Sequence, residues 1–85
     1  MITRTHRNFD KRYARLPTKI QDQFKKRRNL FISQPFHPLL NNHSVDEVFP
    51  GWRSINVTGD YRALYEEREG EVVFMTIGTH SELYS

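Results

Sequence analysis

The sequence predicts an α+β fold, in which an N-terminal αα-hairpin packs on one face of a small twisted antiparallel β-sheet. Apolar residues before position 35 recur at the three- to four-residue spacing of helices, whereas from residue 52 onward they alternate with the two-residue period of strands. Helices followed by consecutive strands are typical of the α+β class. A chain of 85 residues has room for one hydrophobic core, so we expect a single domain over 1–85.

The helical hairpin is expected over about 8–34. Two apolar stripes at helical spacing mark its helices: Phe9, Tyr13 and Leu16 in the first, and Ile20, Phe24 and Phe31 in the second. Pro17 is suited to the first position of the second helix, because the N–H that it lacks would have no helical partner there. Pro35 ends the second helix.

A proline-rich loop over 35–51 leads into a three-stranded meander over about 52–77. The first hairpin turns at Thr58-Gly59, a two-residue loop whose glycine can adopt a positive φ. A short strand is also expected in the first six residues, and a C-terminal turn is expected over 78–85.

Alternation assigns the faces of these strands. In the last strand Val73, Met75 and Ile77 form one apolar set, which we expect to pack on the helices. Ser54 and Asn56 of the first meander strand are expected on a mixed polar face that points away from the helices. A functional site is expected on that open face.

Charge is distributed unevenly along the chain. Residues 1–42 carry ten Lys/Arg and two acids, a net charge of +8, whereas residues 43–85 carry three Arg and eight acids, a net charge of −5. The basic half is typical of a protein that binds a polyanion or an acidic partner, and the structural alternative is a solvated helix surface. The chain has no cysteine, no N-terminal apolar run and no stretch of about 18 apolar residues, so a cytoplasmic protein without membrane contact is expected.

The candidates for chemistry are His80, Asp60, Arg62 and, more weakly, His43. His80 follows the glycine that ends the last strand, and Arg62 lies within an otherwise apolar strand, where it needs an anionic partner. The structural alternatives are turn formation for Asp60 and an ordinary packing contact for His80. No cofactor and no metal are expected, because the sequence lacks HExxH, closely spaced ligands and a Gly-rich phosphate loop. An acid, a base and a cation without a metal suit transesterification of a phosphodiester, with His80 as the general acid, Asp60 or His43 as the base, and Arg62 as the cation that stabilises the phosphorane.

The order of these features resembles the toxins of bacterial type II toxin–antitoxin modules in the RelE/ParE superfamily, within it the YafQ-like and RelE-like branches. The resemblance spans nearly the whole chain. It rests on four segments: "FDKRYARLP" in the hairpin, "LLNNHSV" in the loop, "GWRSINVTGDYRALY" in the strands, and the most specific one, "IGTHSELY", at the end.

The resemblance implies a metal-independent ribonuclease that cleaves mRNA in the ribosomal A site. It assigns His80 as the closing-motif histidine, Tyr84 as the aromatic that orients a nucleobase, Asp60 as the strand-start acid, Arg62 as the strand arginine and His43 as the loop histidine. Candidate substrate contacts are Arg53, Asn56 and Thr76. The chain departs from the YafQ-like pattern where Asn56 replaces a second histidine and Thr76 replaces an arginine. It therefore has fewer cationic side chains that can bind a phosphate.

The expected partners are the ribosome, mRNA and an acidic antitoxin encoded by the adjacent gene, with operator DNA bound only through the antitoxin complex. Two other functions stay open from the sequence. One is a DNA gyrase inhibitor of the ParE type, against which His80, Asp60 and Tyr84 argue because an inhibitor needs no acid–base set. The other is a non-catalytic module that binds RNA or protein through the open face.

Overall fold

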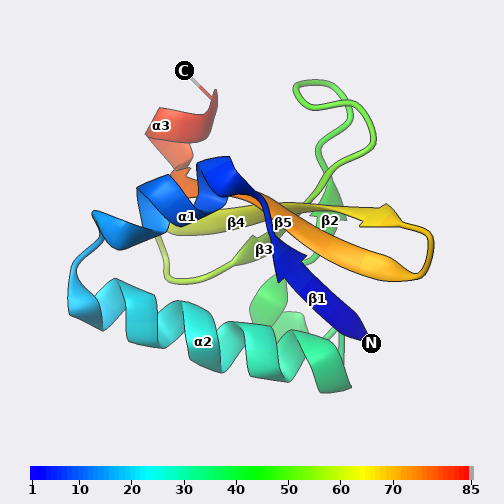
Figure 1. Cartoon of the computed structure of the whole chain (residues 1–85), viewed down its shortest axis with the longest axis horizontal. Coiled ribbons are helices and arrows are strands. Elements are labelled where there is room, and N and C mark those ends of the chain that lie inside the picture. The colour runs from blue at the N-terminus through cyan, green and yellow to red at the C-terminus, as the bar shows by residue number, and fades with distance from the viewer. Residues whose placement is uncertain (85) are drawn as a thin grey trace.

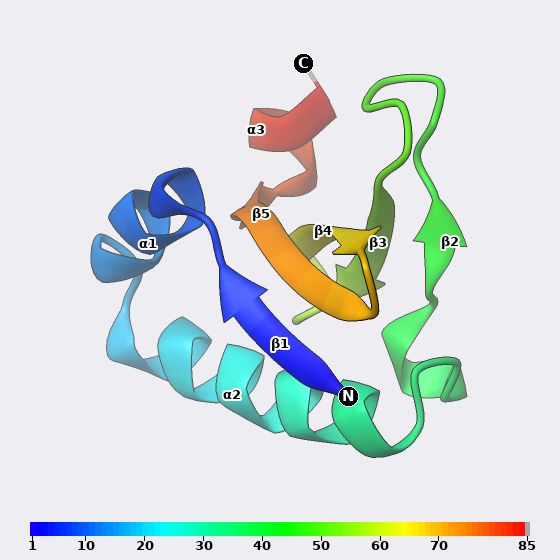
Figure 2. The same cartoon turned by 45° about the vertical axis from the view of Figure 1, so that its right-hand side comes forward.

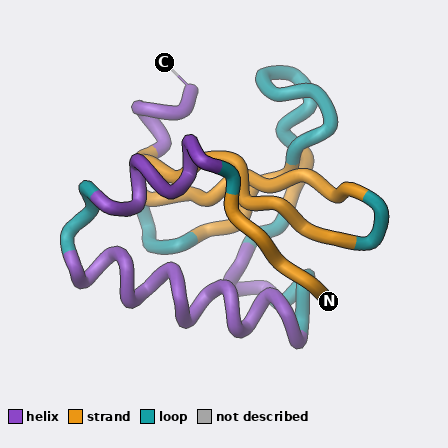
Figure 3. Tube along the Cα trace, viewed as in Figure 1, coloured by secondary structure: helices purple, strands orange, loops and turns teal. Residues whose placement is uncertain are grey.

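The structure, a computed structural model, describes residues 1–84; Ser85, the last residue of the predicted C-terminal turn, lies outside the described residues. It confirms the α+β class, with two long helices against a five-stranded sheet (Figures 1 and 3). The helical segments are α1 (Arg7–Ala14), α2 (Thr18–Ser33), the 3₁₀ helix η1 (Pro38–Leu40) and α3 (His80–Tyr84). The strands are β1 (Ile2–Thr5), β2 (His43–Ser44), β3 (Arg53–Asn56), β4 (Tyr61–Arg68) and β5 (Glu71–Thr79).

The sheet has the order β1-β5-β4-β3-β2 and is mixed. The strands β2 to β5 pair antiparallel with their neighbours, but β1 runs parallel to β5 along the opposite edge (Figure 2). The expected N-terminal strand therefore exists, and its parallel direction is a feature that the strictly antiparallel prediction lacked. No helix in residues 1–84 has the length and apolar character needed to cross a membrane.

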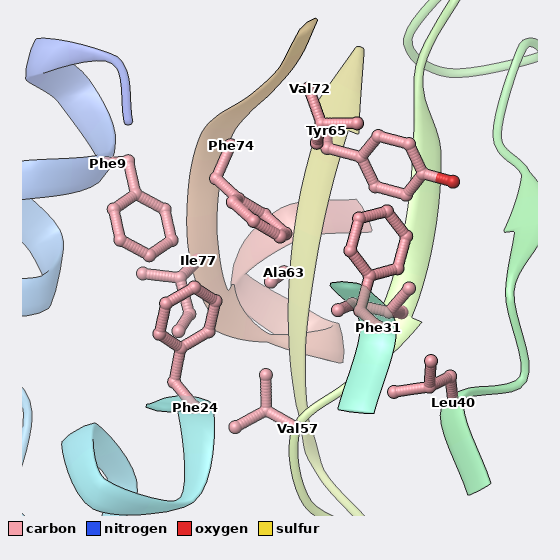
Figure 4. Packing of buried hydrophobic residues seen from close by; sticks show 11 residues of the cluster. Phe9, Phe24, Phe31, Leu40, Val57, Ala63, Tyr65, Val72, Phe74 and Ile77 are labelled. Atoms are coloured by element: carbon pink, nitrogen blue, oxygen red, sulfur yellow. The ribbon is translucent and has the colours of Figure 1, made fainter. Parts of the chain in front are cut away.

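The helices pack on the sheet through an aromatic core. Phe9 of α1 and Phe24 and Phe31 of α2 are buried around Phe74 of β5, with ring centroids 5.2–6.0 Å from that of Phe74 (Figure 4). Full burial of such a side chain stabilises a fold by about 1.5–3 kcal/mol relative to exposure. Aromatic rings therefore provide much of the stability that the low aliphatic content of the chain does not.

The two helices are joined by a tight corner. Pro17 has non-helical angles (φ −55°, ψ 145°), so it precedes the first turn of α2 instead of occupying it, one residue from its predicted place. The Tyr13 hydroxyl donates to the Gln21 carbonyl at 3.1 Å, and the Gln21 amide donates back to the Tyr13 carbonyl at 2.8 Å. These reciprocal bonds hold α1 against α2.

A β-bulge in β5 overturns the predicted face of the last strand. Leu64 of β4 pairs with Thr76, but the next residue, Tyr65, pairs with Phe74, so Met75 is an extra residue on β5. Beyond the bulge the alternation shifts by one. Ile77 and Phe74 both lie in the core on the helix side, whereas Met75 lines a groove on the open face. The prediction that Val73, Met75 and Ile77 share the helix side was therefore wrong.

The first hairpin turn also differs from the prediction. Val57 donates to the Tyr61 carbonyl at 2.9 Å, so the loop has three residues, Thr58 to Asp60, and Gly59 does not adopt a positive φ. The Thr58 hydroxyl accepts from the amides of Asp60 and Tyr61 at 3.2 and 3.0 Å, and this organises the wider loop.

Candidate active site

A groove of about 630 Å³ lies on the face of the sheet opposite α2, between α3 and the loop that joins β2 to β3. Figures 1 and 2 show both of these segments rising from that face. The groove collects four of the predicted residues from three separate elements: His43 of β2, Arg62 of β4, and His80 and Tyr84 of α3. Its volume is in the range of small-molecule sites, which is about 300–1,000 Å³.

His80 is positioned by a capping box. The Thr79 hydroxyl accepts from the Glu82 amide at 3.2 Å, and the Glu82 carboxylate accepts from the Thr79 amide at 2.8 Å. These bonds start α3 directly after β5, so His80 is the first helical residue and its exposed side chain lies at the groove. The His80 amide donates to the Asp60 carbonyl at 3.0 Å, which ties the helix to the β3–β4 turn.

Glu82 links this cap to α1. The hydrogen bonds from Thr79, and more weakly the charge of Arg12, lower the pKa of Glu82, so its carboxylate is ionised at neutral pH. Arg12 Nη2 lies 3.6 Å from Glu82 Oε2, with both side chains about half exposed. A Cβ on Gly78 would lie 2.9 Å from Arg12 Nη2 and 3.3 Å from Glu82 Oε1. The glycine therefore leaves the space through which Arg12 reaches α3.

Tyr84 lies one helical turn after His80. Their ring centroids are 4.7 Å apart, and the ring of Phe49, in the loop before β3, meets Tyr84 edge-on at 6.4 Å. Leu83, which precedes Tyr84 in α3, is buried against Leu64 on the open face of the sheet. The five-residue helix is thus anchored by one aliphatic and one aromatic contact as well as by its cap.

His43 is oriented by its own loop. Its Nδ1 lies 2.7 Å from the Asn41 carbonyl oxygen. Since a carbonyl can only accept, Nδ1 carries the proton, and in the neutral ring Nε2 is left with a free lone pair. In this tautomer Nε2 is the nitrogen that can accept a proton.

Arg62 supplies the positive charge of the groove. Its Nη1 donates to the carbonyls of Thr58, Gly59 and Tyr61, each at 3.1 Å. A guanidinium has five N–H donors, and these three bonds all come from one nitrogen. The hairpin turn thus holds the cation at the edge of the groove while other donors of the same group can meet an anion.

Two acidic residues, Asp46 and Glu47, also line the groove, although no motif in the sequence marks them. The Asp46 carboxylate accepts from the Gly51 amide at 2.7 Å. That bond, together with one between Asp46 and Ser44, lowers the pKa of Asp46. The bond between Asp46 and Gly51, five residues apart, closes the loop, so Asp46 has a structural role at the rim of the site.

Asp60 and Arg53 do not line this groove. Asp60 contributes its backbone carbonyl to His80, while its exposed side chain lies outside the lining. Arg53 pairs with Tyr65, on the helix side of the sheet, and its Nε donates to Asn42 Oδ1 at 2.9 Å. Its guanidinium lies 5.6 Å above the Phe36 ring centroid, so its contacts belong to the packing of the proline-rich loop.

Asn56 and Thr76 lie on the open face but are not part of the groove lining. Asn56 is opposite Arg62 on the neighbouring strand, and its Oδ1 is buried without a hydrogen-bond partner among the described residues. Thr76 lines a second groove beside the first. Within residues 1–84 no group of three or more His, Asp or Glu is arranged to hold a metal ion.

Sequence reasoning also missed Glu82. The signal for it was present, because Thr-x-x-Glu directly after an apolar strand is the pattern of a capping box. In the "THSE" segment the histidine is the predicted functional residue, and no role is predicted for the glutamate. Its threonine and glutamate determine where that histidine lies.

Nearly the whole chain matches the profile of a known protein family. The profile of a family described as "ParE toxin of type II toxin-antitoxin system, parDE" matches residues 4–84. No curated protein sequence matches the chain.

Among solved structures, the chain is similar to YafQ from E. coli, with 18% identity, coverage of 98% of this chain and 97% of that chain, and a TM-score of 0.82. It is also similar to the toxin of the E. coli DinJ–YafQ toxin–antitoxin complex, with 18% identity, coverage of 98% and 96%, and a TM-score of 0.80. The YoeB/ParE toxin from Agrobacterium tumefaciens shares 15% identity over 94% of this chain and 99% of that chain, with a TM-score of 0.76. At these identities the likeness establishes a common fold.

Proposed function

The chain belongs to the ParE toxin family of type II toxin–antitoxin systems, and from that premise we propose that it is a metal-independent endoribonuclease that cleaves mRNA on the ribosome. The observation that carries the proposal is the groove in which His43, Arg62, His80 and Tyr84 lie together. Two imidazoles and a guanidinium on one polar face are the groups that phosphodiester transesterification requires. The sequence resemblance to the YafQ-like and RelE-like branches favours this activity over others in the superfamily, and the fold is similar to that of YafQ.

In the proposed reaction His43 Nε2 removes the proton of a ribose 2′-hydroxyl. The 2′-oxygen attacks the adjacent phosphorus, and Arg62 stabilises the added negative charge of the phosphorane. His80, protonated at the start, gives its proton to the departing 5′-oxygen as the P–O bond breaks. The products are one RNA fragment that ends in a 2′,3′-cyclic phosphate and one that begins with a 5′-hydroxyl. At the end of the step His43 has gained one proton and His80 has lost one.

This assignment revises the role of Asp60. At the sequence level Asp60 and His43 were both candidates for the base, and the tautomer of His43 now favours His43. Tyr84, 4.7 Å from the His80 ring, is proposed to orient a base of the substrate. One arginine and two acids in the groove give little net attraction for RNA. For that reason we propose that the ribosome positions the mRNA, which substitutes for binding energy that this groove lacks.

The proposed partner is an acidic antitoxin from the adjacent gene. The net charge of +8 over residues 1–42 supports it, since complementary charge accelerates association and selects partners. The DinJ–YafQ complex contains an antitoxin bound to a toxin of similar fold. Expression of this chain alone is expected to arrest growth, and co-expression with its antitoxin is expected to restore it.

A second candidate function is inhibition of DNA gyrase, and the ParE description of the family profile favours it. Such an inhibitor would have no need of two histidines oriented in one groove. The two functions separate in vitro, because one cuts mRNA during translation and the other changes plasmid supercoiling.

The test is primer extension on a reporter mRNA in a reconstituted translation reaction with wild-type protein and His80→Ala. Loss of a general acid lowers rates by about 10²–10⁴, so cleavage by His80→Ala should be lost at matched folding and concentration. The control is His37→Asn, which removes an imidazole outside the groove but keeps an acceptor for the Leu39 amide that His37 caps. Equal cleavage by wild type and His80→Ala, or inhibition of gyrase supercoiling without any mRNA cleavage, refutes the proposal.

A further inference from the structure

A second groove, of about 460 Å³, lies beside the first on the open side of the sheet. One wall is formed by α1 and its C-cap residue, Arg15, which lies four residues after Lys11 on the same helix face, with Arg12 beside them. The floor includes Met75, the bulge residue of β5, and the rings of Phe49 and Trp52. A basic helix thus faces an apolar and aromatic floor.

The wall has more positive than negative charge. Three cationic side chains line the groove together with one carboxylate, that of Glu82, which pairs with Arg12. Lys11 and Arg15 are exposed, and neither takes part in an ion pair among residues 1–84. Their charges are available to an anionic ligand.

Aromatic rings connect the second groove to the first. From His80 the contacts run to Tyr84 (4.7 Å between centroids), from Tyr84 to Phe49 (6.4 Å), and from Phe49 to Trp52 (4.9 Å, stacked at 5°). The Trp52 indole N–H donates to Glu66 at 2.9 Å, which holds the indole in place. The row of rings begins at the proposed general acid and ends at Trp52, which lines the second groove together with the cations of its wall.

We propose that the second groove binds nucleotides that flank the scissile bond on the same single RNA strand. This inference rests on the proposed function. Single-stranded RNA is recognised by cations that contact its phosphates and by aromatic rings that stack on its bases. Here both kinds of group are present, and the ring contacts continue from the catalytic groove. An acidic protein segment could satisfy the cations, but that continuity favours RNA.

The test uses fluorescence anisotropy with a 5′-fluorescein octanucleotide of 2′-O-methyl uridine, which cannot be cleaved, titrated at several salt concentrations. The variant Lys11→Ala/Arg15→Ala removes two cations from the wall, and the matched control Lys25→Ala/Lys26→Ala removes two exposed cations from α2. For single-stranded nucleic acid, the slope of the logarithm of the binding constant against the logarithm of the salt concentration changes by about 0.7 per phosphate contact. The wall variant should therefore flatten this slope by about 1.4, and the control should not. Trp52→Leu should weaken binding by about 5- to 150-fold through lost stacking.

Equal effects of the wall and control variants would overturn the inference, because the charge would then act non-specifically. So would the absence of measurable binding by the wild-type protein at low salt. If the wall variant binds RNA normally but loses binding to an acidic amphipathic peptide, the groove serves a protein partner and the inference is wrong. Each of these results is distinct from failure of the proposed function, which is measured separately by the His80→Ala cleavage assay.

Discussion

The capping box of α3 gives a quantitative prediction for activity. Replacement of Glu82 by Ala removes the acceptor of the Thr79 amide and the partner of Arg12, while Leu83 keeps its contact with the sheet. A lost helix cap costs about 0.5–2 kcal/mol. A five-residue helix is too short to be stable without its anchors. Loss of the cap should therefore weaken the docking of α3 on the sheet and displace His80. This cost lowers the docking equilibrium constant of α3 by about 2- to 30-fold, so if activity follows the docked fraction, Glu82→Ala should be less active by up to about 30-fold.

The variant Glu82→Gln is the matched control, because glutamine can still accept from the Thr79 amide. It loses only the exposed pair with Arg12, 3.6 Å apart, and such pairs contribute about 0–1 kcal/mol. Cleavage of a reporter mRNA in a translation reaction, with circular dichroism to verify folding, should rank the proteins as wild type, Glu82→Gln, then Glu82→Ala. If the Gln and Ala variants lose activity equally, the charge of Glu82 matters and the cap does not. If neither loses activity, the positioning argument fails.

The acid range provides an independent check on Glu82. Its pKa is lowered in the folded state by the bonds from Thr79, so its ionised form stabilises the fold above the ordinary carboxyl value of 4.5. That contribution is lost as the pH falls through the lower, folded-state pKa. Thermal unfolding should therefore show that the difference in stability between wild type and Glu82→Gln, which does not titrate, is constant near neutrality and changes below pH 4.5. A difference independent of pH in that range would contradict the assignment.

Three further substitutions test the fold around the site by chemical denaturation. Arg53→Ala should reduce the free energy of unfolding by about 0.5–1.5 kcal/mol, through its lost bond to Asn42, and leave the cleavage pattern unchanged; a changed pattern would restore Arg53 as a substrate contact. Gly78→Ala should displace the flexible end of Arg12 and cost less than about 1 kcal/mol, and a larger cost would mean that the backbone itself is crowded. Phe74→Ala should cost about 3–5 kcal/mol, a large share of the stability of a small domain, and a loss below 1 kcal/mol would contradict the central place of this ring.

The class of fold and the kinds of element were predictable because they depend on local periodicity. The apolar stripes of the two helices include Phe9, Phe24 and Phe31, all of which are buried in the core. The direction of β1 was not predictable in this way. Its residues carry no signal for whether a neighbouring strand runs parallel or antiparallel, and that choice depends on where the chain returns after the helical hairpin.

The bulge at Met75 shows why alternation fails for part of β5. A strand with apolar residues on both faces, such as "EVVFMTI", satisfies alternation in either register, so its pattern cannot reveal one extra residue. The partner strand β4 determines the register, because Tyr65 must face Phe31 and Phe74 in the core. The bulge also moves Met75 to the open face, where it forms part of the floor of the second groove.

The groove itself depends on the register of the shortest strand. In β2, His43 pairs with Ser54 and Ser44 pairs with Arg53, so His43 lies on the same face as Leu64 and Arg53 lies on the helix side. A slip of β2 by one residue against β3 would turn His43 to the helix side of the sheet and remove it from the groove, while Arg53 would keep its face through its pairing with Tyr65. A two-residue strand has too little hydrophobic pattern to select between these registers. The selection comes from Asn42, which donates to the Tyr65 hydroxyl at 2.8 Å and accepts from Arg53 at 2.9 Å, and it is this contact between distant segments that brings the histidine to the site.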